Sequence, residues 1–208
     1  MDKHYLTPLF TPESIVVFAG RIDAPESHNT QAIALVDALR AQRYAGILQF
    51  LDIHTSGTLA DLAQAKADLA IISLEHKDIA PALELAGRMA CRAALVISSG
   101  VGPELSAELK KIARREGMHL LGPNSLGFQR PQLQLNASAA GPLASPGSLA
   151  LVSQSGALTS SMLDWARSNG VGFSSVVSLG PHTSVDIAQA LDFLANDAQT
   201  HSIVVYME

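Results

Sequence analysis

Two serine hydroxyls and a glycine stand at a strand-to-helix turn, where an anion could bind. Ser153, Gln154, Ser155 and Gly156 follow the apolar run 149–152 and precede an amphipathic stretch. The first N–H groups of a helix lack intrahelical acceptors and its macrodipole favours negative charge, so this turn suits a phosphate. A serine that only caps the helix gives the same pattern. Both interpretations stay open, whereas a serine-hydrolase elbow is disfavoured because the turn lacks G-x-S-x-G.

Two further turns follow apolar runs and carry residues able to meet a ligand. The first contains Gly20 and Arg21. Its single glycine does not fit G-x-G-x-x-G, which disfavours a plain NAD-dependent dehydrogenase. Arg21 could pair with a phosphate through its planar guanidinium, or it could be a solvated loop residue. In the second turn, 122–127, Asn124 could bind a ligand or hold the turn closed.

The histidines and the single cysteine give weaker signals. Seven histidines and Cys91 show no metal-ligand spacing, so no metal site is predicted. His182 could act as an acid or base, but an exposed loop histidine is the simpler interpretation. Cys91 is expected to be a small core residue. Trp165 is expected to pack against the sheet, and Ser184 or Asp186 to cap the following helix.

The hydrophobic pattern predicts an α/β fold with a parallel sheet. Short apolar runs alternate with longer helical patterns, which is typical of βαβ units. The expected strands are 15–19, 46–51, 69–73, 93–97 and 119–122, and the expected helices are 30–43, 79–88 and 103–116, with a short segment at 59–64. In the third helix Leu105, Leu109, Ile112 and Ala113 form one apolar stripe, which predicts that it covers a face of the sheet.

A change of composition after residue 128 suggests a second unit. Residues 129–147 contain three prolines and no sustained period, so they are interpreted as a linker. The alternation then resumes, with strands at 149–152, 174–179 and 202–206 and helices at 157–169 and 185–196. These elements are only half of a doubly wound domain. We expect the chain to be a fragment of a longer polypeptide; the alternative is a natural truncation whose exposed faces another chain covers.

Composition narrows the class of partner. The chain has 208 residues, 48% hydrophobic, with a net charge of −5. Its mean hydropathy is +0.22 and its isoelectric point about 5.8. The longest apolar runs, such as 93–97 and 203–207, are too short to cross a bilayer and are expected to be buried parallel strands. The N-terminus lacks a signal-peptide pattern, so a cytoplasmic protein is expected. Basic residues do not cluster, which argues against nucleic acid and anionic membranes. The partner is expected to be a small molecule or another protein.

Several segments in order resemble one family, the nucleoside-diphosphate-forming acyl-CoA synthetases, which are related to the succinyl-CoA synthetase α subunit. The resemblance begins at 9–17, where the family opens with F-x-P-x-S-I-A-V, and continues through 120–127, 135–138, 147–157, 163–166, 172–174, 178–180, 194–197 and 205–208. The segments 122–127 and 135–138 look especially like a bacterial branch. In that branch the synthetase-like region is fused to a C-terminal acetyltransferase domain, forming a protein lysine acetyltransferase.

The resemblance implies a Rossmann-like CoA-binding domain at 1–128, a linker at 129–148, and the first half of a flavodoxin-like succinyl-CoA-ligase domain at 149–208. It implies that CoA or acetyl-CoA is held by Gly20, Arg21, Asp52, Ile53, Ser73, Leu74, Pro123 and Asn124. It also implies that Ser153, Gln154, Ser155 and Gly156 receive the phosphate of a phosphohistidine that Glu208 orients. Two positions depart from the family: Ala19-Gly20-Arg21 replaces Gly-Ala-Ser, and Pro181 replaces an asparagine.

The implied reaction of a complete synthetase converts acyl-CoA, a nucleoside diphosphate and phosphate to the acid, CoA and the nucleoside triphosphate. Its phosphohistidine and its ATP-grasp domain would lie beyond Glu208, so ATP or ADP and Mg would act only in domains absent from this chain. The alternative is an acetyl-CoA-sensing region that regulates an acetyltransferase and has no ligase activity. A third possibility is an interaction module without a ligand. The expected partners are therefore a CoA thioester, the remaining ligase, ATP-grasp or acetyltransferase domains, and a second copy of the chain in a homo-oligomer.

Overall fold

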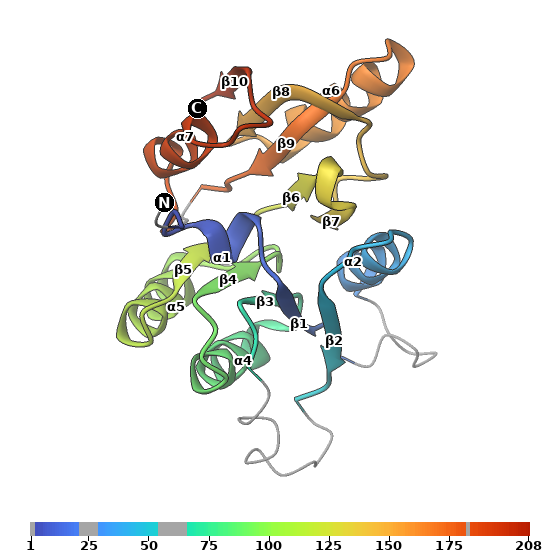
Figure 1. Cartoon of the computed structure of the whole chain (residues 1–208). Helices are drawn as coiled ribbons and strands as arrows, with labels where there is room; N and C mark the ends of the chain where they lie inside the picture. The colour runs from blue at the N-terminus through green and yellow to red at the C-terminus, as the bar shows by residue number, and fades with distance from the viewer. Residues whose placement is uncertain (1–2, 21–28, 54–65, 182–183) are drawn as a thin grey trace.

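The computed structural model describes residues 3–20, 29–53, 66–181 and 184–208, and it contains two five-stranded sheets flanked by helices (Figure 1). The expected helical segment at 59–64 lies outside the described residues, as do Arg21 and His182. The sheets are called sheet A and sheet B in chain order. The observed architecture confirms the expected α/β fold class.

Sheet A consists of five parallel strands in the order β2-β1-β3-β4-β5. Its strands are β1 (Ser14–Phe18), β2 (Ile47–Leu51), β3 (Leu69–Ile72), β4 (Ala93–Val96) and β5 (His119–Leu121). From β1 the chain adds β2 on one side and then returns to add β3 on the other. The switch point, where ligands of such sheets bind, therefore lies between β1 and β3.

The helices around sheet A bury the stripes that the sequence shows. They are α1 (Thr7–Phe10), α2 (Thr30–Arg40), α4 (His76–Arg88) and α5 (Pro103–Arg115). In α5, Leu109, Ile112 and Ala113 are buried and Leu105 packs against the same core, so the predicted stripe is confirmed. Cys91 is buried in this core as well, as expected.

Sheet B is mixed and has the order β10-β8-β9-β6-β7. Its strands are β6 (Gly127–Arg130), β7 (Leu135–Ser138), β8 (Pro146–Ser153), β9 (Phe173–Ser178) and β10 (Ser202–Tyr206), with the 3₁₀ helix η1 (Pro131–Leu133) and the helices α6 (Gly156–Ser168) and α7 (Ile187–Ala195). Strands β10, β8 and β9 are parallel, whereas β6 runs antiparallel to both β9 and β7. Asp186 was one of the two residues expected to cap this helix, and it does so by forming a capping box with Gln189 at the start of α7.

Residues 129–148, which we expected to form a linker, instead contain regular structure. The β6–β7 hairpin is hard to recognise because it buries polar side chains. Gln129 is fully buried, and its Nε2 donates to Ser138 Oγ (3.2 Å) and to the carbonyl of Pro142 (3.2 Å). The hairpin also packs against α2, so it joins sheet B to the helices of sheet A. The proposed division of the chain into domains at 128 and 148 stays a prediction.

One of the hydrophobic cores contains residues of both sheets, and α1 lies between the sheets (Figure 1). Phe10 of α1 has its ring centroid 5.3 Å from that of Phe128 and 4.9 Å from that of Phe193. Phe128 lies in β6, the first strand of sheet B, and Phe193 lies in α7. A short N-terminal helix therefore fixes the two sheets against each other.

Two expectations about burial are wrong. Trp165 is 54% exposed rather than packed on the sheet. Helix α6 buries Leu163, and Trp165 lies about 200° further around the helix, on the solvent side. The last strand was expected to be buried, but β10 is at the edge of sheet B, and Val204 and Tyr206 are 40% and 39% exposed.

In the described part of the chain, no helix is long and apolar enough to cross a membrane.

Candidate functional site

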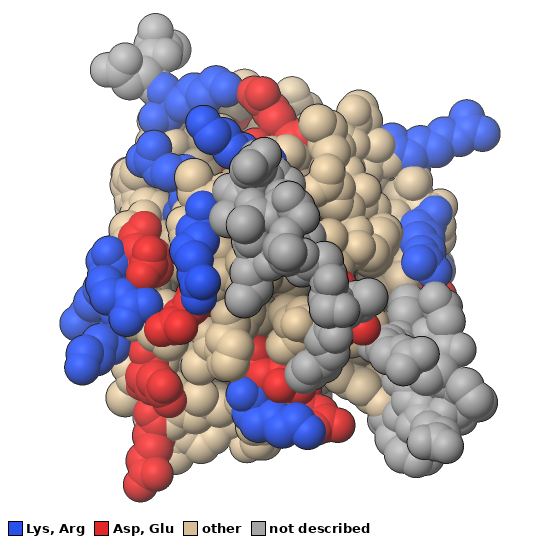
Figure 2. Space-filling view, turned by 90° about the horizontal axis from the view of Figure 1, so that it is seen from below, with Lys and Arg blue, Asp and Glu red and all other residues tan. Residues whose placement is uncertain are grey.

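The carboxyl ends of the strands bring most of the predicted CoA-binding residues to one edge of sheet A. Because the strands are parallel, the turns after them lie along the same edge. Gly20 follows β1, Asp52 and Ile53 follow β2, Ser73 and Leu74 follow β3, and Pro123 and Asn124 follow β5. Seen from below, basic and acidic side chains lie next to one another and neither sign fills the visible face (Figure 2).

Ser73 lies at the switch point between β1 and β3. Its N–H donates to the carbonyl of Phe18 (2.9 Å), and its own carbonyl accepts from Asn29 Nδ2 (3.2 Å). Its hydroxyl is buried and has no hydrogen-bond partner among the described residues. A buried donor without a partner is uncommon and costly, so this hydroxyl is suited to donate a hydrogen bond to a ligand atom.

Asn29 and Ser98 also shape this edge, and neither was predicted from the sequence. Asn29 caps α2 by accepting from Ala32 N (2.9 Å), and its position before a helical stretch was the signal that could have found it. Ser98, after β4, donates to Leu74 O (2.8 Å) and accepts from Leu74 N (3.0 Å). Together these two side chains hold the turn after β3 on both sides.

The side chain of Asn124 ties the turn after β5 to the turn after β4. Its Oδ1 accepts from Val101 N (3.0 Å) and its Nδ2 donates to Val101 O (2.8 Å). The sequence left open whether Asn124 binds a ligand or closes its own turn, and the structure shows its side chain engaged with the main chain of Val101 instead. Any contact of Asn124 with a ligand would therefore involve its main chain.

The turn of Ser153 to Gly156 is closed by its own hydroxyls. Ser153 Oγ donates to Ser155 O (2.9 Å) and accepts from Ser155 N (3.1 Å), and Ser155 Oγ accepts from Leu158 N (3.4 Å). Ser155 is thus the N-cap of α6. The N–H groups of Gly156 and Ala157 occupy the first helical positions, where a helix offers donors to an anion.

Glu208 and the serine turn are neighbours. Glu208 N donates to Gln154 Oε1 (2.9 Å), and Gln154 N donates to Tyr206 O (3.1 Å). These contacts lie at the carboxyl ends of β8 and β10. The structure therefore brings together the two features that the sequence analysis paired, and it places the exposed Glu208 beside the start of α6.

The turn after β5 connects the carboxyl edges of the two sheets. Ser125 Oγ donates to the carbonyl of Ser178, and Leu126 N donates to Ser178 Oγ (3.3 Å). Gly180 lies so close that a Cβ on it would be 2.7 Å from Asn124 O, and a Cβ on Gly156 would be 3.1 Å from Leu126. A ligand lying along the edge of sheet A at this turn would therefore be next to the N-terminus of α6.

Three groups with shifted pKa values, Cys91, Tyr44 and His119, lie away from these turns. Burial, with a smaller effect from Asp68, raises the pKa of Cys91 to about 12, and burial likewise raises that of Tyr44 to about 12. Burial, Arg92 and His4 lower the pKa of His119. Within the ranges described by the structure, no three His, Cys, Asp or Glu side chains are arranged to hold a metal ion.

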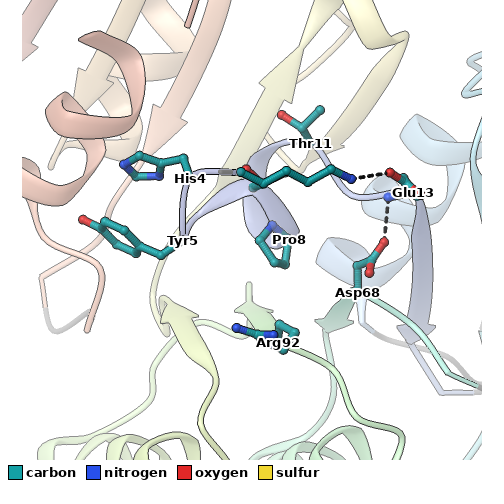
Figure 3. A pocket seen from close by; sticks show the side chains of 9 residues that line it. His4, Tyr5, Pro8, Thr11, Glu13, Asp68 and Arg92 are labelled. Atoms are coloured by element: carbon teal, nitrogen blue, oxygen red, sulfur yellow. Dashed lines mark hydrogen bonds and ion pairs between the residues drawn. The ribbon is translucent and has the colours of Figure 1, made fainter. Parts of the chain in front are cut away.

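A cavity of about 280 Å³ lies at the opposite, amino edge of sheet A (Figure 3). The side chain of Lys3 pairs with Glu13 at 2.8 Å, and Glu13 N donates to Asp68 Oδ2 at 2.8 Å. Residues 68 and 92 immediately precede β3 and β4. This cavity is therefore separate from the turns that carry the predicted CoA-binding residues.

Known proteins resemble this chain over segments that include both sheets. Residues 146–208 match the family described as the succinyl-CoA ligase like flavodoxin domain. Acetate–CoA ligase [ADP-forming] I of Archaeoglobus fulgidus is 41% identical over 147 residues, which are 68% of this chain and 22% of that protein. The chain is a relative of the ADP-forming acetate–CoA ligases. The ligase I subunit alpha of Pyrococcus furiosus is 38% identical over 150 residues, covering 69% of this chain and 32% of the subunit.

The fold of the chain matches an acetyl-CoA synthetase over almost its whole length. The dinucleotide forming acetyl-coenzyme A synthetase 1 of Ca. Korarchaeum cryptofilum, in complex with phosphate and ADP, superposes with a TM-score of 0.85 and 27% identity, over 98% of this chain and 45% of that one. The chain thus spans less than half the length of these ADP-forming ligases and synthetases. The family match begins where β8 begins and includes the serine turn and Glu208.

Proposed function

We propose that the chain is the CoA-binding region of an ADP-forming acyl-CoA synthetase-like ligase, and that CoA or acetyl-CoA binds at the carboxyl edge of sheet A. The proposal depends above all on the turn after β5, which connects this edge to the N-terminus of α6. A ligase of this kind needs its thioester and its phosphoryl group side by side. The turn after β5 and the serine turn at the start of α6 are in contact, so they offer neighbouring positions for the thioester and the phosphoryl group.

The residues at the edge fit the chemistry of CoA. Its phosphates need hydrogen-bond donors, and the buried Ser73 hydroxyl and the main chain at Gly20 are at the switch point. Gly20 has φ of +67°, a conformation that a glycine adopts without strain. Arg21, outside the described residues, stays the proposed partner of a CoA phosphate. An acetyl-CoA-sensing role without ligase activity would use the same edge.

The serine turn would receive the phosphoryl group. In the complete ligase, a phosphohistidine would supply the phosphoryl chemistry, and nucleotide and Mg would bind to domains beyond this chain. The N–H groups of Gly156 and Ala157 would stabilise the negative charge, and Glu208 would fix the imidazole tautomer by accepting its second N–H. The contact between Glu208 and Gln154 supports this pairing of roles.

We expect Ser73→Ala to weaken CoA binding without weakening the fold. Loss of a hydrogen bond to a phosphate lowers affinity by about tenfold. Removal of a buried hydroxyl that has no partner in the part of the chain described by the structure should leave the melting temperature unchanged or raise it. Isothermal titration with CoA and with acetyl-CoA, together with thermal unfolding of each variant, measures both effects. The expected dissociation constant of the unaltered chain is roughly micromolar.

Ser175→Ala is the matched control for this experiment. Ser175 is also fully buried, and its hydroxyl has no hydrogen-bond partner in the described segments, but it lies within β9 of sheet B. Its substitution should leave CoA affinity unchanged. Equal affinities of the Ser73 and Ser175 variants would remove Ser73 from the site. Absence of heat of binding with both CoA and acetyl-CoA would contradict the proposed function itself.

We expect inorganic phosphate to bind at the start of α6. Backbone amide NMR signals of Gly156 and Ala157 should move and saturate as phosphate is added at constant ionic strength, because these N–H groups face the proposed phosphoryl position. Glu208→Gln should preserve or strengthen this binding, since it removes a nearby negative charge. Amide signals of Gly156 and Ala157 that stay fixed throughout the titration would rule the site out.

A further inference from the structure

A cavity of about 460 Å³ lies between α5, β5 and the residues that precede α7. This volume is within the range of small-molecule sites. Lys110 and Arg114 line it from α5, Met118 and His119 from the start of β5, and Ser184 and Asp186 from the segment before α7. The cavity is separate from the turns proposed for CoA and for the phosphoryl group, and it joins residues packed on sheet A to residues of the sheet B half.

Two cations that form no ion pair among the described residues line this cavity. Lys110 and Arg114 are four residues apart on α5, so they lie on the same face of the helix. Neither forms an ion pair with a carboxylate in the ranges that the structure describes. The next residue behaves differently: Arg115 pairs with Glu84 at 3.0 Å and with Glu116 at 2.8 Å. Lys110 is also partly buried, which makes the absence of a counter-ion more costly.

The segment across the cavity adds a fixed hydroxyl donor. The N–H groups of Ser184 and Val185 donate to Leu120 O at 3.1 and 3.0 Å, so this segment is held against β5. Ser184 Oγ is buried and has no hydrogen-bond partner in the described chain. The carboxylate of Asp186 also lines the cavity, but its Oδ1 accepts from Gln189 N (2.8 Å) in the cap of α7. Met118 and Val185 supply apolar walls.

We propose that this cavity binds the phosphate group of a small organic molecule. Lys110 supplies a point charge and Arg114 a planar fork of donors, a combination that matches the several oxygens of a phosphate better than a single acceptor. Ser184 Oγ donates a further hydrogen bond, and the apolar walls contact the organic part. Because the ligand would touch α5 and residues 184–186, its binding would strengthen the contact between the two halves of the chain. This site is independent of the CoA proposal.

A phosphate titration followed by backbone amide NMR tests the site. Inorganic phosphate is the probe, and sodium chloride at equal ionic strength is the reference. We expect saturable shifts of the amides of Met118, His119 and Val185. In the double variant Lys110→Glu/Arg114→Glu, binding should weaken by about tenfold or more. Lys111→Glu, on the same helix but not lining the cavity, changes charge in the same direction and should retain the shifts.

The outcomes separate this site from its alternatives. Shifts that do not saturate, or equal weakening by Lys111→Glu, would show that phosphate only screens surface charge and would overturn the proposal. If the charge-reversed double variant does not fold, Lys110→Gln/Arg114→Gln removes the same charges with less disturbance and should lose the same shifts. The amides of Gly156 and Ala157 report the α6 site in the same spectra. If phosphate shifts the amides at the start of α6 but not those at the cavity, the cavity proposal fails. If it shifts only the amides at the cavity, the α6 proposal fails.

Discussion

Replacing Arg130 by alanine is expected to lower the free energy of unfolding by about 3–5 kcal/mol, because the substitution leaves a buried carboxylate without its countercharge. The side chain of Arg130 is 4% exposed and that of its partner Asp197 is 10% exposed. Arg130 Nη1 lies 3.0 Å from Asp197 Oδ2, and Nη2 donates to Oδ1 at 3.3 Å. The guanidinium also lies over the ring of Phe193, 5.4 Å from its centroid. The pair links β6 to the turn between α7 and β10.

Urea denaturation followed by circular dichroism measures this loss, with Arg167→Ala as the matched control. Arg167 and Asp164 are 53% and 74% exposed and 3.5 Å apart, so their pair should contribute no more than about 1 kcal/mol. Replacing both members of the buried pair, as Arg130→Met/Asp197→Leu, should cost less than Arg130→Ala because no charge stays buried. A loss for Arg130→Ala as small as that of the control would refute the importance of this pair.

Helices with strong amphipathic patterns were predictable almost to the residue. The sequence predicted a helix at 103–116 and the structure has α5 at Pro103–Arg115, because alternating apolar and charged residues leave one possible buried face. The hydrophobic pattern gave wrong predictions where polar side chains are buried or apolar side chains are exposed. Gln129 and Ser138 are buried in a hydrogen-bonded network, so the hairpin looked like a linker. Strand β10 has the composition of a buried strand but lies at an edge.

The candidate site could be predicted as a set of turns, but the role of each side chain could not. Parallel strands place their carboxyl ends on one edge, so the order of the elements already gathers Gly20, Ser73 and Asn124 there. Which of them is free to meet a ligand depends on partners far away in sequence. The amide of Asn124 pairs with Val101, and Ser98 pairs with the main chain of Leu74. Neither contact has a local sequence signal, because both depend on tertiary approach.

Gly122→Ala is expected to destabilise the chain by about 2–5 kcal/mol, since it combines an unfavourable backbone conformation with a steric clash. Gly122 has φ of +83°, and a Cβ there would overlap the carbonyl oxygen of Val96 at the end of β4. Gly170→Ala isolates the first effect: Gly170 has φ of +68°, and its added Cβ would have no atom of a described, non-adjacent residue within 4 Å. The control should therefore cost about 1–2 kcal/mol.

The difference between the two glycine variants measures how tightly the turn after β5 is held against β4. If the turn has to move to relieve the clash, the contacts of Ser125 with Ser178 and of Asn124 with Gly180 are disturbed as well. Those contacts connect the edge of sheet A with the start of α6, so CoA affinity should fall in Gly122→Ala under conditions where it is still folded. Urea denaturation and isothermal titration of both variants test the two effects. Equal stabilities would mean that the main chain at Val96 yields without cost, and the rigid connection between the two edges would then be refuted.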